Sequence, residues 1–159
     1  MRLKELRGVI AMSYKEKAVE YYNNNFNCSQ GVFTAFATEM GMEEKLALKL
    51  ATNFGGGERK GELCGAVAGA LMVLGLRCGH CDSEDIEGKS KAYAVSTEFM
   101  DRFIKKNGSV VCRELLGYDL TKAEDKLLIE EQKLFKTFCP KMVESAAEIV
   151  NEMIAVGMC

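Results

Sequence analysis

Cysteine is the residue type in this chain with the widest chemistry, because its thiolate attacks disulfides and binds soft metal ions. The sequence holds seven cysteines but only one histidine and no tryptophan. With His80 alone, a multi-histidine metal site or a serine triad with a spare histidine is hard to build. In a reducing compartment, such thiols serve redox or metal chemistry more often than structural cross-linking. The cysteines are therefore the leading candidates for function.

Four of the cysteines lie where the sequence predicts helices to begin, and these are Cys28, Cys64, Cys112 and Cys139. A helix N-terminus presents unpaired N–H groups and about half a positive charge, which favours the thiolate and lowers a cysteine pKa from about 8.5. Basic residues near three of the four act in the same direction. We predict that the four thiols share one catalytic or metal-binding site, with Cys64 as the nucleophile. Taken alone, each is also consistent with a small apolar core side chain.

The remaining cysteines include a C-x-x-C tetrapeptide, Cys78-Gly79-His80-Cys81. Its thiols are candidates for a disulfide relay or a pair of metal ligands. A thioredoxin-type site needs a strand leading into the motif, whereas the sequence predicts a helix there. The alternative is a helix terminator followed by exposed thiols. Cys159 is expected to be a free thiol.

Helical spacing of apolar residues recurs along the chain, runs of alternating β-branched residues are absent, and Pro140 is the single proline. We therefore predict an all-α fold, a single-domain bundle of about seven helices over residues 13–159. Helical segments are expected at 14–24, 29–40, 43–54, 63–77, 86–106, 109–116, 121–135 and 141–155.

The segment 63–77 is apolar on most faces and rich in glycine and alanine, which let neighbouring helices approach closely. It is predicted to be the central buried helix. The preceding segment, GGGERKGE at 55–62, holds four glycines in eight positions and is expected to form a tight loop. It lacks the G-x-x-x-x-G-K-[ST] pattern, so no nucleotide site is predicted.

Composition narrows the class of partner and the compartment. The 21 basic residues nearly balance the 23 acidic ones, so nucleic acid is not an expected partner. The longest apolar run, 66–76, falls short of the ~20 residues needed to span a bilayer, and the N-terminus is a poor signal peptide. We expect a cytoplasmic protein without membrane insertion. Ser13 and Glu16 begin a helix after Met12, so residues 1–12 are expected to be a disordered N-terminal extension.

The chain resembles the C_GCAxxG_C_C family of redox-active proteins from about Met12 onward. The signature Cys-Gly-Ala-x-x-Gly is matched by residues 64–69, and three further family cysteines map onto Cys28, Cys112 and Cys139. The matching segments, in order, are NCSQ, FGGG, GELCGAVAGALMVLGL, VCRELLG and FCPKMV. The resemblance implies a redox function for these four thiols. It also implies partners among oxidoreductases or membrane transporters, because such proteins tend to be encoded near their genes.

Three functions remain open at this point. The first is thiol–disulfide or electron-transfer chemistry, which would make the protein a thiol-based oxidoreductase. The second is a site of four thiolate ligands for zinc or an iron–sulfur cluster, held by Cys28, Cys64, Cys112 and Cys139, with Cys78 and Cys81 as a further ligand pair. The third is a non-catalytic accessory protein of a transporter or oxidoreductase system, in which the cysteines are structural.

Overall fold

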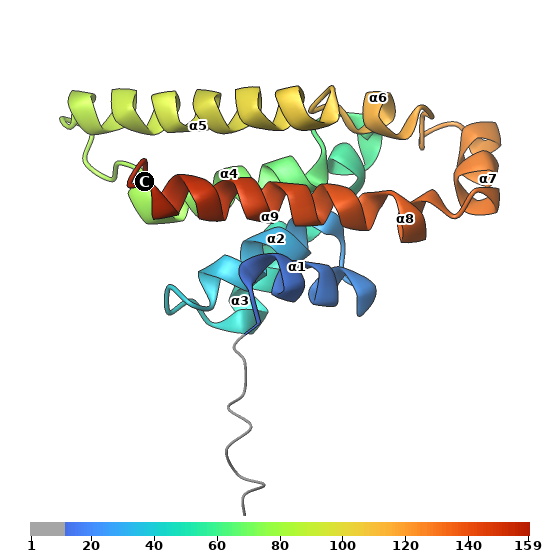
Figure 1. Cartoon of the computed structure of the whole chain (residues 1–159), viewed down its shortest axis with the longest axis horizontal. Helices are drawn as coiled ribbons and strands as arrows, with labels where there is room; N and C mark the ends of the chain where they lie inside the picture. The colour runs from blue at the N-terminus through green and yellow to red at the C-terminus, as the bar shows by residue number, and fades with distance from the viewer. Residues whose placement is uncertain (1–11) are drawn as a thin grey trace, which may run out of the picture.

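The computed structural model describes residues 12–159, which form an all-α domain (Figure 1). Within this part of the chain, seven helices have seven residues or more, which confirms the predicted fold class. The predicted N-terminal extension, residues 1–12, lies outside the described residues apart from Met12. The helices are α1 (Tyr14–Asn23), α2 (Cys28–Ala37), α3 (Glu44–Ala51), α4 (Gly65–Cys78), α5 (Ile86–Asn107), α6 (Cys112–Leu116), α7 (Ala123–Glu131), α8 (Leu134–Thr137) and α9 (Cys139–Ala155).

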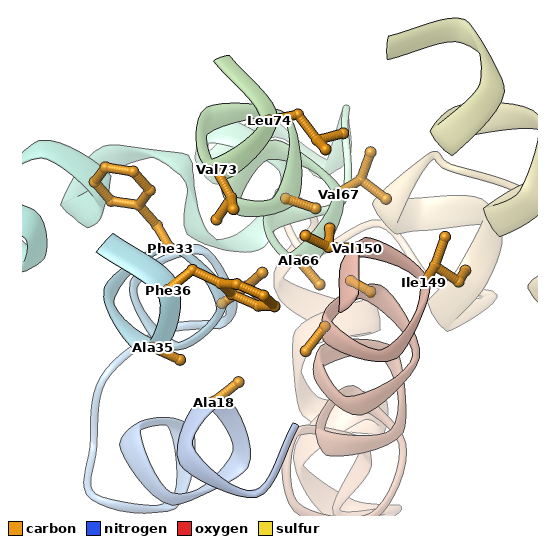
Figure 2. Packing of buried hydrophobic residues seen from close by; sticks show 14 of the residues in the cluster. Ala18, Phe33, Ala35, Phe36, Ala66, Val67, Val73, Leu74, Ile149 and Val150 are labelled. Atoms are coloured by element: carbon orange, nitrogen blue, oxygen red, sulfur yellow. The ribbon is translucent and has the colours of Figure 1, made fainter. Parts of the chain in front are cut away.

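Helix α4 lies at the centre of the bundle, as its small residues predicted, and packs against α2, α5 and α9. Its first six residues, 65–70, are all buried. A β-carbon built on Gly69 would lie 2.7 Å from the carbonyl oxygen of Ser29, so glycine allows α2 to approach at this point. Around this contact, Ala18, Phe36, Ala66 and Val150 from α1, α2, α4 and α9 point toward one another (Figure 2).

Helix α9 buries one face along its whole length and runs beside α4 and α5 (Figure 1). The long helix α5 packs over both through three buried side chains, Val95, Phe99 and Phe103. A smaller apolar cluster of Cys112, Leu116, Leu120 and Ile129 lies beyond the main core, where α6 and α7 pack near Phe135 and Phe138. The main core holds the long helices together, and the smaller cluster closes one end of the bundle.

Some helix boundaries differ from those predicted. The expected helix 121–135 is interrupted because Lys133 adopts a left-handed φ of 56°, so α7 ends at Glu131 and α8 begins at Leu134. The expected helix 109–116 begins only at Cys112, because the Ser109 hydroxyl accepts the N–H of Val111 in a turn. No helix within residues 12–159 is long and apolar enough to cross a membrane.

Candidate functional site

Cys28, Cys64, Cys112 and Cys139 line a single cavity of about 230 Å³. Each stands at a helix start: Cys28, Cys112 and Cys139 are the first residues of α2, α6 and α9, and Cys64 immediately precedes α4. The helix starts predicted for these cysteines are therefore confirmed to within three residues. The structure brings together the four thiols that the sequence singled out. We call this cavity the four-cysteine pocket.

The rest of the pocket wall is mostly apolar, with a few polar side chains among the hydrophobic ones. The apolar lining residues are Phe26, Leu115, Leu116, Leu120, Phe135, Phe138 and Met142, and the polar ones include Tyr22, Asn27, Arg59 and Lys126. A cavity of this size and character admits a small molecule or a narrow group rather than a folded protein surface.

Cys28 lies against the start of α4. A β-carbon built on Gly65 would lie only 2.3 Å from its Sγ, so this sulfur rests against the first residue of α4, next to Cys64. A negative charge on Cys28 raises the pKa of each of the other three thiols. Each of the other cysteines thus has Cys28 as a neighbour within electrostatic reach.

Burial dominates the ionisation of these thiols. It raises the pKa of Cys64, Cys112 and Cys139 to about 12, and it also raises the pKa of Cys28. Cys64 and Cys112 are only 6% and 8% exposed. The prediction that helix starts lower these pKa values is therefore wrong in its net direction. Removing a thiolate from water destabilises it more than the helix N-termini stabilise it.

Backbone N–H groups at the helix starts still favour the thiolates, but by less than burial disfavours them. Backbone N–H groups of Gly56, Ser29 and Ala66 favour the Cys28 thiolate and oppose the burial that raises its pKa. The N–H groups of Ala66 and Val67 do the same for the pKa of Cys64. Cys28 and Cys64 therefore share Ala66 as a stabilising backbone donor.

The glycine segment before Cys64 is a left-handed turn. Gly56, Gly57, Glu58 and Arg59 have φ values of 65°, 57°, 54° and 61°. A non-glycine residue in this conformation costs about 1–2 kcal/mol, and the segment contains two. Position 57 requires glycine, because a β-carbon there would lie 2.4 Å from the Glu62 nitrogen and 2.9 Å from the Cys112 β-carbon.

Backbone hydrogen bonds hold the end of this turn against the segment before α6. The Cys64 N–H donates to the Val110 carbonyl at 2.7 Å, and the Cys112 N–H donates to the Glu62 carbonyl at 2.6 Å. Between them lies an antiparallel bridge, the one strand-like pairing in the described part of the chain. These bonds fix Cys64 and Cys112 on the same side of the pocket.

Two cationic side chains, Arg59 and Lys126, are exposed where they line the pocket. Neither forms an ion pair with any residue in 12–159. Burial raises the pKa of Cys112, and the Arg59 guanidinium opposes this shift because it favours the thiolate. Arg59 lies five residues before Cys64 in the sequence, but the thiolate that it favours is that of Cys112.

Tyr22 is a site residue that sequence reasoning missed. Its hydroxyl donates to the Phe135 carbonyl at 2.7 Å and also favours the thiolate of Cys139, lowering a pKa that burial raises. Burial, with Cys139 and Cys28 nearby, raises the pKa of Tyr22 itself. Tyr22 lies on α1, and no spacing in the sequence connects that helix with a cysteine. The packing of α1 against α9 creates the contact.

A metal centre is not preformed in residues 12–159, because no three or more His, Cys, Asp or Glu side chains lie together as a group that could hold an ion. The zinc and iron–sulfur alternatives predicted four pocket cysteines as ligands, with Cys78 and Cys81 as a further pair. The four thiols share a cavity without forming such a group.

Of the other three cysteines, Cys78 and Cys159 depart from the prediction. Cys78 forms a disulfide with Cys159, so Cys159 is not a free thiol and Cys78 is not paired with Cys81. Cys81 is free and exposed. The reason is the course of α9, which runs beside α4 and brings the residues that follow it to the end of α4 at Cys78. The C-x-x-C motif therefore does not act as a self-contained pair in this structure.

Comparison with protein families matches residues 26–153 to a family model described as "Putative redox-active protein (C_GCAxxG_C_C)". This stretch contains all four pocket cysteines and ends before Cys159. Comparison with curated proteins and with solved structures gives no match.

Proposed function

Because the chain belongs to the C_GCAxxG_C_C family, described as redox-active, we propose that it transfers electrons by thiol–disulfide exchange in the four-cysteine pocket. The observation that carries the proposal is the convergence of Cys28, Cys64, Cys112 and Cys139 on one cavity. Exchange needs an attacking thiol and a second thiol within reach of it, and Cys28, which acts electrostatically on each of the other three, supplies the second.

We assign the attack to Cys112 and the resolving step to Cys28. Arg59 favours the Cys112 thiolate and is an exposed residue of the pocket lining, where it can attract a negatively charged substrate. Cys28 has the largest electrostatic effect on Cys112 of any charged neighbour. This assignment differs from the sequence-based expectation of Cys64 as the nucleophile, because Cys28 and Cys112, rather than a cation, act on the pKa of Cys64.

The proposed reaction is balanced in electrons and protons. The Cys112 sulfur attacks one sulfur of a substrate disulfide, and its proton passes to the sulfur that leaves as a free thiol. Cys28 then attacks the mixed disulfide at Cys112, and its proton passes to the second departing sulfur. One substrate disulfide becomes two thiols, and the two protein thiols become a Cys28–Cys112 disulfide.

The ionisation of the thiols supports a direction of electron flow from the protein to the substrate disulfide. A thiol with a low pKa stabilises the reduced state as a thiolate and makes the protein an oxidant. Burial raises the pKa of Cys112 to about 12, so at neutral pH the reduced state gains no such stabilisation. The site is therefore suited to give electrons away and to reduce a disulfide.

The pocket also suggests the class of substrate. A cavity of about 230 Å³ limits the disulfide to a small molecule. The exposed cations Arg59 and Lys126 line the pocket, and most of the rest of its lining is apolar. We propose that the substrate is a small disulfide with negatively charged groups.

The test compares two small disulfides of opposite charge, dithiodiglycolate and cystamine. The fully reduced protein is mixed with each, trapped with N-ethylmaleimide, and examined by peptide mass spectrometry. We expect a Cys28–Cys112 disulfide to form, and to form faster with dithiodiglycolate. If none of the four thiols is oxidised by either probe, exchange in the pocket is disproved. A metal found in the protein as purified under anaerobic conditions would support the metal-binding alternative instead.

A further inference from the structure

At the other end of α4 from the pocket lie three cysteines, Cys78, Cys81 and Cys159, that the proposed reaction does not use. We propose that they form a second redox site, in which the exposed Cys81 thiol exchanges with the Cys78–Cys159 disulfide. This inference is independent of the chemistry in the four-cysteine pocket.

The disulfide joins the last residue of α4 to the segment that follows α9. Its Cα atoms are 5.7 Å apart, and 81 residues of sequence separate its two cysteines. Both sulfurs lie against the carbonyl oxygen of Leu74, Cys78 at 3.2 Å and Cys159 at 3.8 Å. Either sulfur, once reduced, therefore has an acceptor for its S–H in place.

Cys81 is placed for attack by the way α4 ends. Gly79 turns the chain out of the helix into an extended conformation, while its N–H still donates to the Gly75 carbonyl at 2.8 Å. A β-carbon on Gly79 would lie 2.4 Å from that carbonyl oxygen, so this exit requires glycine. Residues 79–82 have no regular structure and are exposed. Three positions after Cys78, Cys81 has the C-x-x-C spacing at which two cysteines form a disulfide.

On the leaving side, Cys159 is partly buried against the main core, and the residues before it form backbone hydrogen bonds with the end of α9. Val156 and Met158 are exposed, and the Cys159 carbonyl accepts a hydrogen bond from Nε of Arg77 at 3.2 Å. Because the Val156 and Met158 side chains are exposed, this segment can carry the Cys159 sulfur away when its bond to Cys78 breaks.

The exchange is an isomerisation and needs no external oxidant. The Cys81 thiolate attacks the Cys78 sulfur, the Cys78–Sγ to Cys159–Sγ bond breaks, and a Cys78–Cys81 disulfide forms. The Cys159 thiolate leaves and takes up the proton that Cys81 released. One disulfide replaces another, and the link between α4 and α9 becomes a local link within the tetrapeptide.

The test maps the disulfides of the full-length protein. Protein is equilibrated in a buffer of reduced and oxidised dithiothreitol, quenched with acid, alkylated with N-ethylmaleimide and digested with trypsin. Cleavage after Arg77, Lys89 and Lys141 places Cys78 and Cys81 in peptide 78–89 and Cys159 in peptide 142–159. Fragment ions then distinguish an internal Cys78–Cys81 bond from a bond between the two peptides.

We expect both species in the wild-type protein, peptide 78–89 closed on itself in some molecules and joined to peptide 142–159 in others. The matched controls are Cys81→Ser, which should show the joined species only, and Cys159→Ser, which should show the closed species only. The proposal is overturned if wild-type protein never yields the closed peptide at any buffer ratio. That result needs no variant, so it does not depend on how either variant folds.

Discussion

The Sγ atom of Cys28 lies against Gly65, where a β-carbon would come within 2.3 Å of the sulfur. The same β-carbon would lie 2.9 Å from the Phe54 carbonyl oxygen, which belongs to the backbone and cannot rotate away. The start of α2 and the start of α4 therefore meet through a residue that has no side chain. This contact places the Cys28 thiol beside Cys64.

Gly65→Ala should destabilise the protein and disturb the pocket. The added methyl group has no room, so we expect the free energy of unfolding to fall by about 1–3 kcal/mol, measured by urea denaturation. Gly75→Ala on the same helix is the control, because nothing lies within 4 Å of its β-carbon position. It should raise the free energy of unfolding by about 0.5–1 kcal/mol. Equal effects of the two substitutions would contradict the role given to Gly65.

Glu58→Gly should stabilise the protein, because glycine removes the strain of a left-handed φ of 54°. We expect the free energy of unfolding to increase by about 0.5–1 kcal/mol. This net value allows for the extra conformational entropy that glycine gives the unfolded chain, which offsets part of the relieved strain. Lys60→Gly is the neighbouring control, since Lys60 does not have a positive φ. Its free energy of unfolding should fall instead. A fall in both variants would argue against strain at Glu58.

The stability of the protein should decrease in alkaline solution. Burial raises the pKa of Cys64, Cys112 and Cys139 from 9.0 to about 12, so above pH 9 the unfolded chain releases protons that the folded state keeps. The free energy of unfolding should therefore be level up to about pH 8 and fall as the pH rises from 9 toward 12. Urea denaturation of the reduced protein at several pH values measures this, and Cys112→Ala should fall less steeply. A decline with the same slope in both proteins would show that Cys112 does not contribute.

Arg59→Gln should remove the preference for a negatively charged disulfide. The guanidinium favours the Cys112 thiolate and attracts anions, so we expect oxidation by dithiodiglycolate to slow by about tenfold and oxidation by cystamine to change less. The rates come from stopped-flow mixing followed by N-ethylmaleimide trapping. Lys60→Gln, which removes an adjacent charge outside the pocket lining, is the control and should leave both rates near wild type. The assignment fails if Arg59→Gln slows both probes equally.

Cys159→Ser should lower the free energy of unfolding by about 2–4 kcal/mol, because the disulfide closes a long loop in the unfolded chain. Chemical denaturation under non-reducing conditions measures the loss. Cys81→Ser, which removes an exposed free thiol, should change it by less than about 0.5 kcal/mol. If wild-type protein and Cys159→Ser unfold at the same denaturant concentration, the disulfide contributes nothing to stability.

The sequence predicted the site through local signals. Asn27 and Gln30 form a capping box at the start of α2, and Pro140 follows the start of α9, so the chain itself indicates that Cys28 and Cys139 begin helices. The small residues of α4 likewise predicted its central position. These features depend on neighbours within a few residues, and sequence patterns report such neighbours well.

The features that the sequence missed depend on contacts between distant segments. The direction of the thiol pKa shifts follows from burial, which several packed helices produce together and which no single helix start reveals. The bond between Cys78 and Cys159 follows from α9 lying beside α4. The sequence did not indicate the left-handed conformation of Glu58 and Arg59, because neither residue type favours it. The surrounding contacts impose it.

The Cys78–Cys159 disulfide also closes a covalent ring within the chain. Residues 78–159 form the ring, which contains Cys112 and Cys139, while Cys28 and Cys64 lie in the segment before it. Along the backbone, 75 residues separate Cys64 from Cys139, but through the ring closure the path is 14 residues to Cys78 and 20 more from Cys159. The shorter path lowers the entropy cost of bringing these two thiols together by about 0.7 kcal/mol. A covalent bond at one end of the bundle thus helps the chain to assemble the pocket at the other.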